Sequence, residues 1–78
     1  MRQGRACMQR EVAEFVIYII NEIANQKGCS TSEVYQALAR VRAIEDYLAP
    51  FYDVLHTMDS RQVVDDTLVY AQKRGVVL

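Results

Sequence analysis

The sequence contains few of the residues that bind metals. Cys7, Cys29 and His56 are the only cysteines and the only histidine among 78 residues. A structural zinc site takes four ligands, so a single chain cannot build one from these three side chains. No close cysteine or histidine pair exists from which two chains would start a shared site. We therefore expect no metal and no cofactor, and in a cytoplasmic protein we expect both thiols to be reduced.

An excess of positive charge is missing too. Nine lysines and arginines stand against ten aspartates and glutamates, which gives a formal net charge of -1. Proteins dedicated to nucleic acids usually carry a basic excess that neutralises phosphates. The basic residues here are scattered and gather only weakly, at Arg2, Arg5 and Arg10 and at Arg40 and Arg42. Nucleic-acid binding is therefore not expected.

No signal for export and no membrane span is recognisable. Glu14, Asn21 and Glu22 interrupt the apolar run that follows the basic N-terminal residues, and this run lacks a cleavage-like end. A membrane-spanning helix needs about 20 predominantly apolar residues, whereas this run carries two carboxylates. We expect the protein to be cytoplasmic.

The composition is that of a folded domain. Apolar residues make up 51% of the chain and charged residues 24%, a balance typical of soluble globular proteins. A chain of this length forms one small domain and buries only about 60–65% of its unfolded surface. We predict a single helical domain over residues 8–78, preceded by a flexible tail at residues 1–7.

The longest pattern predicts a helix over residues 8–27. Its polar residues fall along one side at a period of 3.6 residues, and Gly28 supplies the left-handed conformation that commonly ends a helix. The apolar face is very wide. One apolar row contains Val12, Phe15, Val16, Ile19 and Ile23, and a second row beside it contains Ala13, Ile17, Ile20 and Ala24.

Three further helices are predicted, over residues 31–42, 44–56 and 60–74. Ser30 and Glu33 match a capping box for the first of these, with Thr31 or Ser32 as alternative caps. Pro50 either kinks the second helix or breaks it and opens a new one at the favoured first position; we favour the break. In the absence of a convincing strand, the fold class is all-α, a small bundle of four main helices.

The wide apolar face of the first helix suggests association. A helix that is apolar over most of its circumference lies either at the centre of a fold or between subunits. Four short helices provide little interior for it, which favours a homodimer or contact with a partner protein. The alternative is a central helix wrapped by the other three. Phe15, Ile19 and Ile23 are our candidate partner-binding residues on this helix.

The stretch FYDVLHTMDS, residues 51–60, concentrates polar side chains. His56 falls at the predicted end of a helix, where its ring can cap a free carbonyl, and Asp53 is close enough to pair with it. A second interpretation is a ligand or partner contact through Tyr52, Asp53, His56 and Thr57. Catalysis by His56 would need a nucleophile or a bound substrate. Neither a nucleophile motif nor a glycine-rich phosphate loop is present, so we predict no catalytic residue.

A bacterial family catalogued as domain of unknown function 3791 resembles this chain in two long segments, EFVIYIINEIANQKGCSTSEVYQAL and IEDYLAPFYDVLHTMDSRQVVDDTLVYAQKRGV. The similarity covers residues 12–76, and its most specific piece is YDVLHT, residues 52–57. The family often has a glycine shortly after this motif, where residues 58–60 of this chain are MDS. No activity is established for the family. The encoding of such proteins beside ADP-ribosyltransferase-like proteins implies an antitoxin-like or accessory role.

The leading functional hypothesis is a non-enzymatic helical module that associates with itself or with a partner protein. The alternative is a DNA-binding transcriptional regulator in which residues 30–56 act as a helix-turn-helix. A recognition helix needs exposed basic and amide residues. This segment instead offers Glu45, Asp46 and Asp53, so we prefer the interaction module.

Overall fold

The computed structural model describes residues 9–78. The predicted flexible tail at residues 1–7 lies outside the described residues, as does residue 8, where the predicted domain begins. Within the described part the chain is all-α, as predicted, and contains no strand. In chain order the helical segments are α1 (Arg10–Lys27), α2 (Thr31–Arg40), η2 (Ile44–Leu48), α3 (Tyr52–Leu55) and α4 (Ser60–Gln72).

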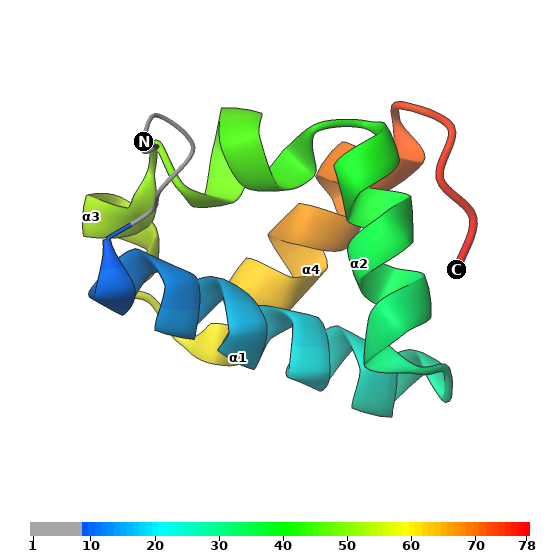
Figure 1. Cartoon of the computed structure of the whole chain (residues 1–78), viewed down its shortest axis with the longest axis horizontal. Coiled ribbons are helices and arrows are strands. Elements are labelled where there is room, and N and C mark those ends of the chain that lie inside the picture. Colours follow the sequence, from blue (N-terminus) through cyan, green and yellow to red (C-terminus); the bar gives the residue numbers. More distant parts are fainter. Residues whose placement is uncertain (1–8) are drawn as a thin grey trace, which may run out of the picture.

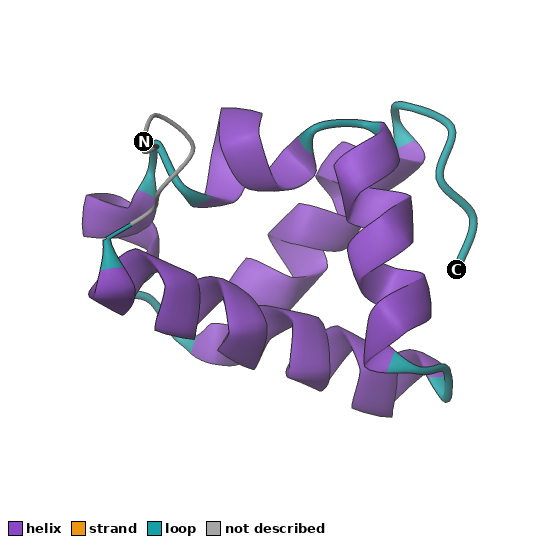
Figure 2. Cartoon of the chain, in the orientation of Figure 1, coloured by secondary structure: helices purple, strands orange, loops and turns teal. Residues whose placement is uncertain are grey.

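The helices surround one core (Figure 1). Helix α1 contacts both α2, which crosses its C-terminal end, and α4, which crosses behind it. Segments η2 and α3 complete the bundle on the side opposite the α1–α2 connection, and only loops or turns join the helices (Figure 2). The largest fully buried side chains come from α1, α2, η2 and α4; they are Ile19, Ile23, Leu38, Leu48, Val34, Val63 and Thr67.

The connection from α1 to α2 is formed by capping residues that can be recognised in the sequence. Gly28 has a φ of 69° and donates its N–H to the carbonyl of Ala24 at 2.9 Å, which ends α1. Ser30 then accepts a hydrogen bond from the N–H of Glu33 at 3.1 Å, and its own N–H donates to the Glu33 carboxylate at 2.9 Å. The predicted capping box is therefore confirmed, with Ser30 as the cap.

Helix α2 ends two residues before the predicted boundary at residue 42. Arg42 adopts the left-handed conformation, with a φ of 58°, at a position where glycine is the usual residue. Its guanidinium Nε lies 3.3 Å from a carboxylate oxygen of Asp46, one turn further along. This turn directs the chain out of α2 and into η2.

The predicted helix over residues 44–56 is broken, as we favoured. Segment η2 is one π-helical turn, in which the N–H of Ala49 reaches back five residues to the carbonyl of Ile44 at 2.9 Å. Pro50 has no N–H with which to continue the helix. The expectation that Pro50 opens the next helix is wrong, because residues 49–51 form a turn and α3 begins at Tyr52.

Helix α4 begins as predicted and ends two residues early. The carboxylate of Asp59 accepts from the N–H of Arg61 at 3.3 Å and caps the helix. Gly75, with a φ of 97°, then turns the chain back, so that the N–H of Val76 reaches the carbonyl of Ala71 at 3.0 Å. The side chain of Val76 is buried, which secures the C-terminal residues to the core.

Candidate functional site

The predicted partner-binding residues of α1 divide into two groups. Ile19 and Ile23 are both 0% exposed within a single chain, covered by the neighbouring helices. This corrects their assignment to a partner-binding surface and matches the alternative of a central helix. Phe15, one turn earlier, is only half-buried and remains at the edge of the core.

Phe15 belongs instead to a cluster of three rings with Tyr52 and His56. The rings of Phe15 and Tyr52 meet edge to face: their centroids lie 5.5 Å apart and their planes are inclined at 73°. Tyr52 stacks on His56 with a centroid distance of 4.4 Å and an angle of 12°. Phe15, a candidate on the first helix, thus meets Tyr52 and His56, two candidates from the stretch at residues 51–60. The cluster joins α3 to the N-terminal half of α1.

The remaining polar groups of the motif end helix α3. His56 Nδ1 lies 2.8 Å from the carbonyl of Tyr52, and the Thr57 hydroxyl donates to the carbonyl of Val54 at 2.7 Å. The predicted capping role of His56 is confirmed. The predicted pairing with Asp53 is wrong, because the imidazole stacks on Tyr52 and Asp53 is exposed without an ion pair to it. The motif is a structural joint whose outer face presents Asp53 and Val54.

A second aromatic stack holds η2 against α4. The rings of Tyr47 and Tyr70 lie 5.0 Å apart and nearly parallel, and the guanidinium carbon of Arg74 lies 3.6 Å from the centroid of the Tyr70 ring. Burial raises the pKa of the Tyr47 phenol above its ordinary value, and the negative charge of Asp66 raises it further. The folded protein therefore favours the neutral phenol.

The raised pKa of Tyr47 predicts a loss of stability in alkali. Stability from the neutral phenol is complete below the ordinary pKa, about 10, and is lost as the pH rises through the higher pKa of the folded state. Tyr47→Phe cannot ionise, so we expect its urea midpoint to fall less than that of the wild type between neutral pH and about pH 11. Tyr52→Phe, which removes the hydroxyl of a half-buried tyrosine and keeps its ring, controls for the loss of a hydroxyl. Parallel pH profiles for wild type and Tyr47→Phe would refute this coupling.

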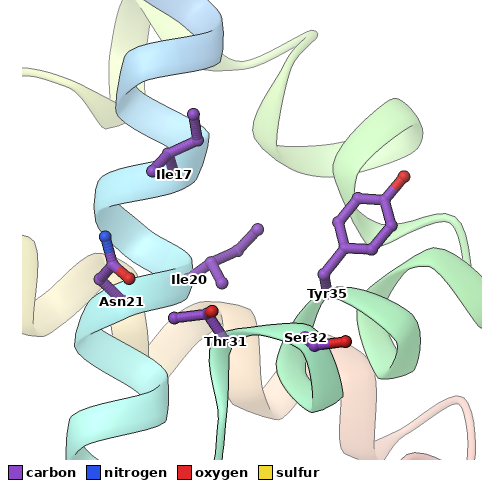
Figure 3. A pocket seen from close by; sticks show the side chains of 6 residues that line it. All are labelled: Ile17, Ile20, Asn21, Thr31, Ser32 and Tyr35. Carbon is purple, nitrogen blue, oxygen red and sulfur yellow. The ribbon is translucent and has the colours of Figure 1, made fainter.

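The most exposed apolar feature at the centre of α1 is a surface that we call the α1–α2 face. It surrounds an open hollow of about 320 Å³ between the two helices, lined by Ile17, Ile20, Asn21, Thr31, Ser32 and Tyr35 (Figure 3). Ile17 is 58% exposed and Tyr35 is 54% exposed, whereas Ile20 is 7% exposed and lies against the core. No lining side chain carries a formal charge.

In the sequence, Ile17 and Tyr35 lie beside the main apolar faces of the helices that contain them. Ile17 belongs to the second apolar row of α1, and Tyr35 flanks the apolar face of α2. The sequence feature that indicated an exposed apolar face is the width of the apolar surface on the first helix, which exceeds what α2 and α4 cover. The hollow itself depends on how the two helices cross, which no local pattern specifies.

Two other classes of site, a metal site and a membrane-spanning helix, have no counterpart among the described residues. No group of three or more histidine, cysteine, aspartate or glutamate side chains between residues 9 and 78 is placed to hold one metal ion. Among the helices of this same part of the chain, none combines the length and the apolar character needed to cross a membrane.

Comparison with known proteins supports the resemblance seen in the sequence. The chain matches the family described as "Protein of unknown function (DUF3791)" over residues 14–74. It belongs to this family, and the match includes all of α2, η2, α3 and α4 together with most of α1. No curated protein and no solved structure matches the chain.

Proposed function

We propose that this protein is a non-enzymatic helical interaction module that associates with a second copy of itself through the α1–α2 face. The observation that carries the proposal is the exposure of Ile17 and Tyr35 beside the hollow between α1 and α2. Burial of apolar surface drives most protein association. Tyrosine is enriched at interfaces because it buries a large ring and keeps a polar end in contact with water.

The chemistry of the face suits contact between identical copies. In a two-fold dimer the same surface meets itself, so a charged patch would face like charges. The lining of the hollow carries only aliphatic, hydroxyl, amide and phenol groups. On the preceding turns of α1, Arg10 and Glu14 form an ion pair at 3.4 Å. Each copy thus offers a projecting apolar side chain, Ile17, beside a recess with an uncharged lining.

An enzymatic role has less support. The ring of His56 is engaged by Tyr52, and the hydroxyl of Thr57 is engaged by a backbone carbonyl. These contacts direct the polar groups of the motif toward ending a helix, whereas a catalytic base needs a neighbouring nucleophile or a bound substrate.

The DNA-binding alternative also has less support. Its recognition helix would lie between Ile44 and Leu55, which the structure divides into one π-helical turn and one short helix. The exposed side chains of the π turn include Glu45 and Asp46, which phosphate groups repel. An antitoxin-like or accessory role remains compatible with the proposal, because another protein would use the same apolar face.

Hydrogen exchange of the backbone at two protein concentrations tests where association occurs. We expect amides around Ile17–Asn21 and Thr31–Tyr35 to exchange more slowly in concentrated than in dilute protein, because a second copy covers them. Amides around Val54 and Val69, whose side chains are 60% and 48% exposed, should exchange equally in both samples. Slower exchange confined to Val54 or Val69 would place the contact elsewhere and overturn the proposal.

A further inference from the structure

We draw no further inference here: the strongest candidate outside the α1–α2 face, the exposed apolar pair Phe51 and Val54 around the short helix α3, is an unpartnered patch, and nothing in the structure shows what covers it.

Discussion

Replacing Ile19 with alanine is expected to destabilise the fold by about 2–5 kcal/mol, the range observed when a large buried aliphatic side chain is truncated. Ile19 is 0% exposed and belongs to the cluster that joins α1 to α2 and α4. Truncation removes apolar contacts and leaves a cavity that close-packed neighbours fill only in part. Urea denaturation followed by circular dichroism measures the loss as a lower midpoint.

The matched control for Ile19→Ala is Val69→Ala, which shortens an aliphatic side chain that is 48% exposed on α4. We expect it to change the free energy of unfolding by at most about 0.5 kcal/mol, as surface substitutions usually do. Both variants are measured in dilute and in concentrated protein. The assignment of Ile19 to the core of one chain fails if Ile19→Ala unfolds like the control, or if its effect disappears in dilute protein.

Replacing Tyr52 with alanine is expected to cost about 2–3 kcal/mol of stability. The ring contacts Phe15 on one side and His56 on the other, and such aromatic pairs contribute roughly 0.5–1.5 kcal/mol each beyond the area that they bury. Without the ring, α3 loses its aromatic contact with Phe15 of α1. The same urea titration measures the effect.

Tyr52→Phe separates the ring from its hydroxyl. No hydrogen bond from the Tyr52 phenol occurs among the described residues, so the phenylalanine variant should unfold within about 0.5 kcal/mol of the wild type. A Tyr52→Ala variant as stable as the wild type would show that the motif is not a joint. The polar side chains of residues 52–57 would then have to be explained by binding.

The local features of the fold could be predicted because single residues specify them. Ser30 and Glu33 form a capping box, and Gly28 adopts the left-handed conformation; each feature depends on side chains within a few residues. The break at Pro50 follows from a missing N–H in the same way. These elements define an all-α bundle before any tertiary contact is considered.

The irregular connection after α2 could not be predicted in the same way. Arginine is not a residue that indicates a left-handed turn, yet Arg42 adopts one. The π turn of η2 places Leu48 in the core while Tyr47 stacks on Tyr70. The Tyr47–Tyr70 contact joins η2 to α4, which lies further along the chain, whereas the periodic pattern over residues 44–56 suggests a regular helix instead.

The candidate site was harder to predict, for a related reason. Ile17 and Ile19 are both isoleucines on the apolar side of α1, but one is 58% exposed and the other is fully buried. Which of the two a neighbouring helix covers depends on where that helix crosses. The sequence showed that the apolar surface of α1 is wider than the neighbouring helices can cover. Only the arrangement of the helices shows that Ile17 is the residue left exposed.

Sedimentation equilibrium over a range of protein concentrations is the most direct test of association through the α1–α2 face. The measurement compares the wild type with Ile17→Lys and with the control Val69→Lys, each of which adds a lysine to an exposed helical position three or four residues after an acidic side chain. We predict that the wild type and Val69→Lys rise toward twice the 9.0 kDa of one chain, and that Ile17→Lys stays at 9.0 kDa. A wild type that remains at 9.0 kDa throughout, or an Ile17→Lys variant that associates as the wild type does, would contradict the account.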